Sequence, residues 1–192
     1  LLIVSKNRSI SDIIEYVKVG HKYFGENKVQ EAKIKFQDQN LKIFKNINLS
    51  LIGPLQTNKV NLALQIFDNI QSIDRIKLID EIEKQLGKLK KIKTKSFFIQ
   101  VNIGKEKQKS GVHPDETKQI IEYSKKKKLN VIGLMCIPPN VTDPSLYFEE
   151  MKLIRDKIDT NLLLSMGMSG DYELALKHGS NQIRVGSLLF ND

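Results

Sequence analysis

An α/β fold of the (β/α)8 TIM-barrel type is predicted by eight short apolar segments, which recur at a nearly constant spacing of about 24 residues along this 192-residue chain. Amphipathic segments with helical spacing of their apolar residues lie between them. No turn sequence typical of an antiparallel hairpin joins two neighbouring segments. We therefore expect parallel strands that close into a barrel. An open, doubly wound sheet is the alternative, because periodicity does not report closure.

The apolar segments are rich in β-branched and aromatic side chains and end in polar or small residues. The first of them, LLIVSK, is a continuous apolar run of the kind that forms a strand covered on both faces. The predicted strands are 1–6, 23–27, 49–53, 70–74, 97–102, 131–136, 162–167 and 182–186.

Helix boundaries between these strands also have recognisable signals. Ser9 and Asp12 have the spacing of a capping box. Asp74 is placed to cap a helix that ends at Gly87. Three further helices are predicted to begin at Pro114, at Pro144 and, over 171–177, directly after the seventh strand.

Composition indicates one globular domain, 1–192, since the chain is 40% hydrophobic and 28% charged and has no linker or second-domain shift. No apolar stretch approaches the roughly 20 residues of a membrane span, and LLIV is too short to be read as a secretory signal. The single cysteine, Cys136, fits a reducing, cytoplasmic location. The chain starts at Leu1, directly in a strand, so we expect a preceding segment with the first helix to be missing from the sequence.

The net charge of +9 comes from 31 basic residues, of which only four are arginines. Nucleic-acid readers usually cluster arginine and interleave aromatic side chains for stacking. Here the lysines are scattered or lie in runs such as 125–128, without aromatic interleaving. We interpret that run as a solvated helix end and expect no specific nucleic-acid partner, which leaves weak binding to polyanions open.

Polar residues gather where the predicted strands end, which is the edge that carries the chemistry of such barrels. After the seventh strand, Ser169 and Gly170 precede a helix, and after the eighth, Gly186 and Ser187 do so. Small residues let a backbone approach a ligand, and barrels commonly bind phosphate at these two loops. A phosphorylated ligand is favoured over the alternative of two turns that only cap helices.

Lys6 lies at the end of the first strand, which neighbours the eighth in a closed barrel. At the rim of an apolar layer, desolvation would favour a neutral, nucleophilic amine that forms an imine, although a strand-end lysine can also extend to water. A lysine, a phosphate loop and an arginine, Arg184, together match the needs of pyridoxal 5′-phosphate (PLP). A cationic arginine at the pyridine nitrogen would disfavour ring protonation and limit carbanion chemistry.

Seven motifs, in register over nearly the whole chain, resemble those of the pyridoxal phosphate homeostasis protein family, single-domain relatives of the alanine racemase N-terminal barrel. They are VSK (4–6), FGENKVQEA (24–32), IGPLQTNK (52–59), QVNIGKEKQKSG (100–111), GLMCI (133–137), SMGMSGDYE (165–173) and IRVGSLLF (183–190). The resemblance implies that Lys6 is the imine lysine and that Asn27 and Asn58 line the pocket. It also implies Ser169, Gly170, Gly186 and Ser187 at the phosphate and Arg184 at the ring nitrogen.

The chain departs from the family pattern in two places close to these motifs. Leu49 and Ser50 stand where the family usually has an aromatic residue and a histidine, so the hydrogen bond made by that histidine is not expected to be kept here. Ser9 stands where the family often has a proline.

The resemblance implies a reversible PLP carrier in the cytoplasm, a monomer without metal or catalytic residues, that passes the cofactor to PLP-dependent apoenzymes. The alternative is a PLP-dependent amino-acid racemase of low activity, which would lack a second base unless Cys136 or Tyr172 serves. A Schiff-base aldolase acting on a phosphosugar and a polyanion-binding module are further alternatives. Addition of PLP separates the aldolase, which stays colourless, from a PLP protein.

Overall fold

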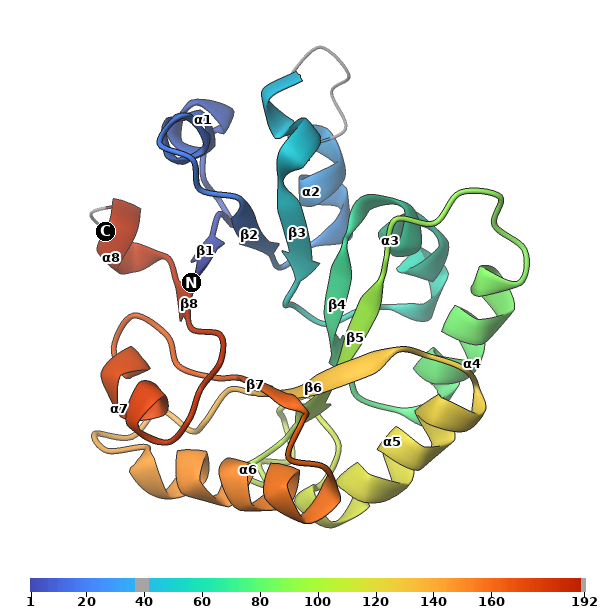
Figure 1. Ribbon diagram of the computed structural model, residues 1–192, viewed down its shortest axis with the longest axis vertical. Coiled ribbons are helices and arrows are strands. Elements are labelled where there is room, and N and C mark those ends of the chain that lie inside the picture. The colour runs from blue at the N-terminus through green and yellow to red at the C-terminus, as the bar shows by residue number, and fades with distance from the viewer. Residues whose placement is uncertain (37–41, 191–192) are drawn as a thin grey trace.

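The computed structural model describes residues 1–36 and 42–190. Its strands form one eight-stranded parallel sheet with helices around the outside (Figure 1). In chain order the elements are β1 (Leu2–Val4), α1 (Ile10–Lys18), β2 (Tyr23–Glu26), α2 (Val29–Phe36), η1 (Lys42–Asn46), β3 (Asn48–Leu51), η2 (Thr57–Lys59), α3 (Val60–Ile66), β4 (Asn69–Ile73), α4 (Ile76–Leu86), β5 (Ser96–Val101), η3 (Pro114–Glu116), α5 (Thr117–Lys126), β6 (Val131–Cys136), α6 (Ser145–Ile158), β7 (Leu163–Ser165), α7 (Tyr172–Lys177), β8 (Arg184–Val185) and α8 (Ser187–Phe190).

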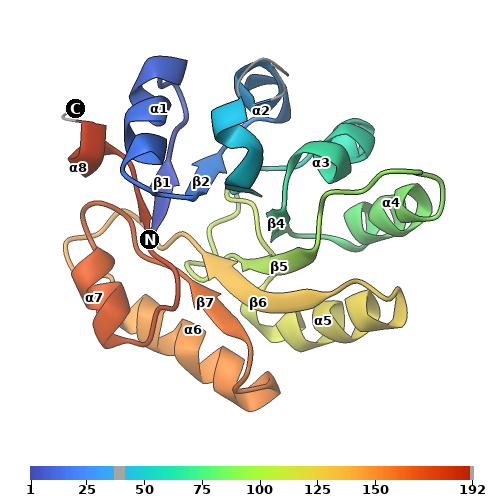
Figure 2. The same cartoon turned by 45° about the horizontal axis from the view of Figure 1, so that its top comes forward.

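The sheet runs in the order β7-β6-β5-β4-β3-β2-β1-β8, so every strand from β1 to β7 pairs with its neighbours in sequence. Closure is made between β7 and the segment that leads into β8. A bridge joins Ser165 to Gln182, and the Met166 N–H donates to the Gln182 carbonyl over 3.1 Å. The ring of strands is visible in Figure 2. The barrel prediction is confirmed, and the doubly wound alternative is wrong because the strand order never reverses.

The predicted strands are all present, and each ends within two residues of its predicted end. The largest shifts matter for the site. β1 ends at Val4 rather than at Lys6, which places Lys6 in the turn after the strand. Short strands that end early leave their polar residues in the loops at the barrel rim, where they are free to face a ligand.

The helix signals give a mixed result. The capping box of Ser9 and Asp12 is present at α1, and Gly87 ends α4. The cap predicted for Asp74 is wrong: Arg75 is the N-cap of α4, and the Asp74 carboxylate pairs with the Arg75 guanidinium instead. Pro114 is the first residue of the 3-10 helix η3. Pro144 is the N-cap of α6, so this helix begins at Ser145, one residue later than predicted.

The hydrophobic core lies between the strands and the helices that surround them, and its largest fully buried side chains include Phe24, Phe67 and Phe148. Part of the barrel interior is polar. The Gln71 amide donates to the Gln182 side chain over 2.5 Å and accepts from the Ser165 hydroxyl over 2.7 Å. These bonds join β4 to β7 and to the segment before β8, so they support the region where the barrel closes.

No helix in the described ranges has both the length and the apolar character needed to cross a membrane.

Candidate functional site

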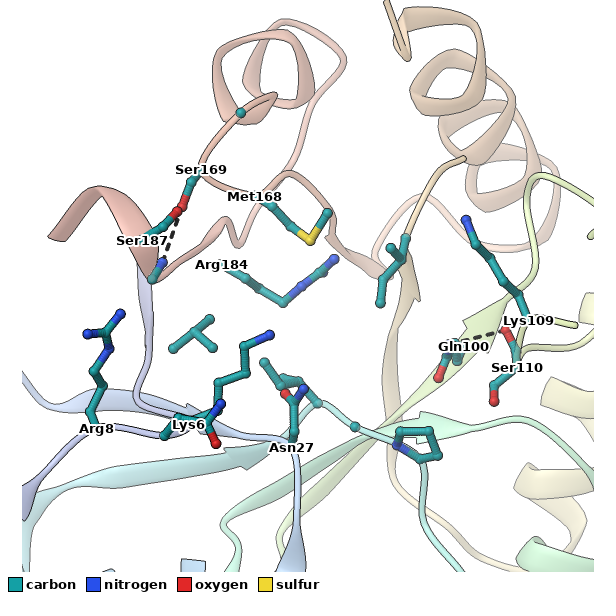
Figure 3. Close-up of a pocket in the computed structure, with 18 of the residues that line it drawn as sticks. Lys6, Arg8, Asn27, Gln100, Lys109, Ser110, Met168, Ser169, Arg184 and Ser187 are labelled. Carbon is teal, nitrogen blue, oxygen red and sulfur yellow. Dashed lines mark hydrogen bonds between the residues drawn. The ribbon is translucent and has the colours of Figure 1, made fainter. Parts of the chain in front are cut away.

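A cavity of about 760 Å³ opens at the carboxyl ends of the strands, where the loops after seven of the eight strands converge (Figure 3). This volume is within the range of about 300–1,000 Å³ typical of small-molecule sites. Its lining residues are Val4, Lys6, Asn7, Arg8, Asn27, Ile52, Gly53, Pro54, Gln100, Gln108, Lys109, Ser110, Ile137, Met168, Ser169, Gly170, Arg184, Gly186 and Ser187.

Lys6 lies in a turn directly after β1, in which the Arg8 N–H donates to the Ser5 carbonyl over 3.1 Å. Its side chain points into the cavity (Figure 3) and is exposed, so the desolvated amine expected at the strand end is wrong. The physical reason is that β1 stops two residues earlier. Across residues 1–36 and 42–190, the Lys6 ammonium has no hydrogen-bond or ion-pair partner. This amine is therefore available to a ligand.

Arg184 lies in β8 with only 3% of its surface exposed, and its guanidinium faces the cavity across from Lys6 (Figure 3). Nη1 donates to the Ser165 carbonyl over 2.6 Å and to the Ser165 hydroxyl over 3.0 Å, while Nη2 donates to the Cys136 carbonyl over 2.7 Å. Burial lowers the pKa of Arg184, but a guanidinium remains protonated at neutral pH. These bonds fix a permanent cation in one orientation.

The loops after β7 and β8 meet at the cavity, as the sequence predicts. The Gly186 N–H donates to the Ser169 hydroxyl over 3.3 Å and so joins the two loops. A side chain at position 186 would come within 3.3 Å of the Val4 backbone and side chain, so glycine allows β8 to approach β1 closely there. Ser169, Gly170 and Ser187 all line the same part of the cavity.

Asn27 lines the cavity from the end of β2, next to Gly53 at the end of β3. A Cβ at position 53 would lie 2.2 Å from the Asn27 carbonyl oxygen, so only glycine permits this close approach of the two strand ends. Asn58 is different: it lies exposed in η2 and is not among the residues that line the cavity. Seven of the eight predicted site residues are therefore brought together, and Asn58 is not.

The side of the cavity formed by Gln100, Lys109 and Ser110 was not assigned a role by the sequence, although these residues belong to the motif at 100–111. They lie across the cavity from Lys6 (Figure 3). The Gln100 amide donates to the Ser110 carbonyl over 3.2 Å, and its Oε1 is buried without a hydrogen-bond partner in the described part of the chain. Polar residues at the end of a predicted strand are the signal that could have found this side.

Four cations line the cavity: Lys6, Arg8, Lys109 and Arg184. No aspartate or glutamate is among the described residues that line it. Apolar contacts come from side chains such as Ile52 and Ile137. The arrangement suits a small, partly apolar ligand that carries a negatively charged group and a carbonyl with which the Lys6 amine can react.

Neither of the two residues considered as a second base lines this cavity. Cys136 is fully buried, and burial raises the pKa of its thiol to about 12, so the thiol stays protonated at neutral pH. The Tyr172 hydroxyl donates to the Glu173 carboxylate over 3.2 Å.

Ser50, which replaces the expected histidine, is fully buried in β3, and its hydroxyl has no hydrogen-bond partner among residues 1–36 and 42–190. Among the described residues, Ser50 therefore does not replace the hydrogen bond that a histidine would make at this position.

The family of the alanine racemase N-terminal domain matches residues 5–192. A pyridoxal phosphate homeostasis protein of Aquifex aeolicus is 37% identical over 203 residues, which cover all of this chain and 86% of that protein. The structure of PipY from Synechococcus elongatus without PLP superposes with a TM-score of 0.87 at 30% identity, covering 98% of this chain and 91% of PipY. The structure of PipY with PLP bound superposes with a TM-score of 0.82 at 31% identity, covering 99% of this chain and 92% of PipY.

Proposed function

Because the chain belongs to the family of the alanine racemase N-terminal domain, we propose that it binds PLP reversibly and acts in PLP homeostasis as a cofactor carrier. The observation that carries the proposal is the amine of Lys6, which has no bonding partner in the described part of the chain and lies in a cavity lined by cations. Two resemblances support it: the Aquifex relative is named for PLP homeostasis, and PipY has been solved with PLP bound.

The residues present fit this cofactor. PLP supplies an aldehyde, which condenses reversibly with a primary amine, and a phosphate on the other side of its ring. In the proposed arrangement Lys6 provides the amine, and the backbone and hydroxyls of Ser169, Gly170, Gly186 and Ser187 hold the phosphate. Glycines and serines suit this role because they allow close approach and offer N–H and O–H donors.

Arg184 is proposed to face the pyridine nitrogen and Asn27 to line the pocket beside the ring. A guanidinium has donors only, so it can hold a neutral ring nitrogen as acceptor and opposes its protonation. An unprotonated ring is a weaker electron sink, and this favours holding the cofactor over carbanion chemistry. Asn58 matches the family motif, but we assign it no role in binding because it is exposed and does not line the cavity.

The proposed carrier is a cytoplasmic monomer that passes PLP to PLP-dependent apoenzymes. The single cysteine supports a reducing compartment. The exposed side chain of Lys6 supports exchange of the cofactor with solution.

Reduction with borohydride tests cofactor binding at this site. We expect PLP to give the protein a yellow absorption band, and peptide mapping after reduction to locate one phosphopyridoxyl group on Lys6. A colourless protein at saturating PLP, or a label on another lysine, would contradict the proposal.

Absence of catalysis is tested with the PLP-loaded protein and L-alanine in deuterated water. A second base is needed for efficient two-base racemisation, and the PLP-bound form is expected to exchange the α-proton no faster than free PLP does. Proton NMR measures the exchange. Rapid exchange would favour the racemase alternative, and the Lys6→Ala variant then shows whether that exchange depends on this site.

A further inference from the structure

The turn that carries Lys6 is held from outside the cavity by side chains of β2 and α2. On the near side of Lys6, the Ser5 hydroxyl donates to Glu26 Oε1 over 2.7 Å, and the Ser5 carbonyl accepts from Lys35 Nζ over 2.6 Å. On the far side, the Asn7 N–H donates to Glu31 Oε1 over 2.6 Å. The residues immediately before and after Lys6 are therefore both anchored.

Asn7 has a positive φ of 58°, the left-handed conformation that most residues with a side chain avoid. Asparagine tolerates this conformation better than most residues, and a hydrogen bond to its backbone N–H helps to hold it there. Glu31 supplies that bond. The direction in which the chain leaves Lys6 thus depends on a carboxylate of α2.

Glu31 and Lys35 are four residues apart on α2, and the distance between Glu31 Oε1 and Lys35 Nζ is 2.6 Å. Lys35 is 7% exposed and also lies 3.0 Å from Glu26 Oε1, whose residue is fully buried. Burial opposes ionisation of Glu31, yet the bonds from Lys35 and the Asn7 N–H hold the pKa of this carboxyl below its usual range. Burial raises the pKa of Glu26, against the hydrogen bond from Ser5 and the charge of Lys35.

The Lys35–Glu26 pair is shielded from water and so keeps a more definite geometry than an exposed pair, whereas the bond from the Asn7 N–H to Glu31 is more exposed. None of Glu26, Glu31 and Lys35 lines the cavity. Their contact with the site passes through the backbone on either side of Lys6. A cluster that only stabilised the barrel would not need to bind both flanking residues of this one turn.

We propose that Glu31 and Lys35 are positioning residues, which hold the turn at residues 5–7 so that the Lys6 amine is directed into the cavity before the cofactor arrives. The inference rests on the proposed function. It adds that part of the affinity for PLP comes from preorganisation of the lysine by α2.

The test compares Glu31→Ala with the unaltered protein. Removing the carboxylate frees the Asn7 N–H, and loss of a hydrogen bond to a charged group is expected to weaken PLP binding about tenfold. The PLP-induced absorption band measures binding. In the protein without PLP, amide hydrogen exchange at Asn7, followed by NMR, is expected to be faster in the variant. The conservative variant Glu31→Gln retains an acceptor oxygen and should restore much of both properties.

Glu81→Ala is a matched control on α4. Glu81 also pairs with a lysine of its own helix, and its side chain is 24% exposed, compared with 22% for Glu31. This variant should leave PLP affinity and Asn7 exchange unchanged. If the unaltered protein binds no PLP, the proposed function fails. If it binds and Glu31→Ala binds equally well with unchanged Asn7 exchange, the positioning role is refuted and the proposed function stands.

Discussion

The variant Lys6→Ala is expected to lose covalent attachment of PLP completely, while the fold is retained because this exposed side chain has no bonding partner among the described residues. The loops after β7 and β8 would still hold the phosphate, so weak binding should persist. We expect the affinity for PLP to fall at least about hundredfold, which corresponds to about 2.8 kcal/mol. Absorption spectra and mass spectrometry after borohydride reduction measure the change.

Lys109→Ala is the control for this experiment, because it removes the same charge from the same cavity on the side away from Lys6. Electrostatic attraction for the phosphate falls in both variants, but only Lys6→Ala removes the proposed reacting amine. The Lys109 variant should therefore still show one reduced adduct on Lys6. An adduct that survives in Lys6→Ala would assign the reacting amine to another lysine.

The variant Gly53→Ala is expected to destabilise the protein by about 3 kcal/mol, the upper end of the usual cost of overpacking, as judged by urea unfolding followed by circular dichroism. The added methyl group would lie 2.2 Å from the Asn27 carbonyl oxygen and 2.8 Å from the Asn27 Cα. Both are backbone atoms, so relief requires the ends of β2 and β3 to separate, and overpacking of this kind commonly costs about 1–3 kcal/mol. Because Asn27 lines the cavity, PLP binding should weaken as well.

Gly87→Ala provides the comparison for that experiment. A Cβ at position 87 would meet its nearest neighbours, the carbonyls of Lys84 and Glu83, at ordinary distances of 3.7 and 3.8 Å. Its φ of −73° is accessible to alanine. We expect a stability change within about 0.5 kcal/mol. Equal effects of the two substitutions would show that the close approach at Gly53 does not constrain the fold.

Periodicity and strand-end chemistry predicted the barrel and most of the cavity lining, because parallel strands bring their carboxyl ends to one rim. Lys6, Arg184 and the two glycine-serine loops were found in this way. Closure was expected, but the contact that makes it, the pairing of Ser165 with Gln182, could not be found, since no local pattern reports contacts between distant segments.

The arrangement of α2 was equally hidden. Glu31 and Lys35 have the spacing of an ordinary surface ion pair. The sequence does not show that α2 is oriented with this pair facing Ser5 and Asn7. The position of Lys6 beyond the end of β1 was missed for a related reason. A run of apolar residues marks a strand but fixes its last residue only to within one or two positions.

β1 pairs with β8, with Leu2 opposite Arg184, and this β1–β8 seam joins the first and last strands of the barrel. Contacts between residues so distant in sequence form late, because the entropy of closing a long loop must be overcome first. Lys6 lies on one side of this seam, and Ser169, Gly186 and Ser187 lie on the other. Lys6 therefore precedes nearly all the rest of the pocket in sequence, and the pocket is complete only when β8, the last strand of the barrel, has paired with β1.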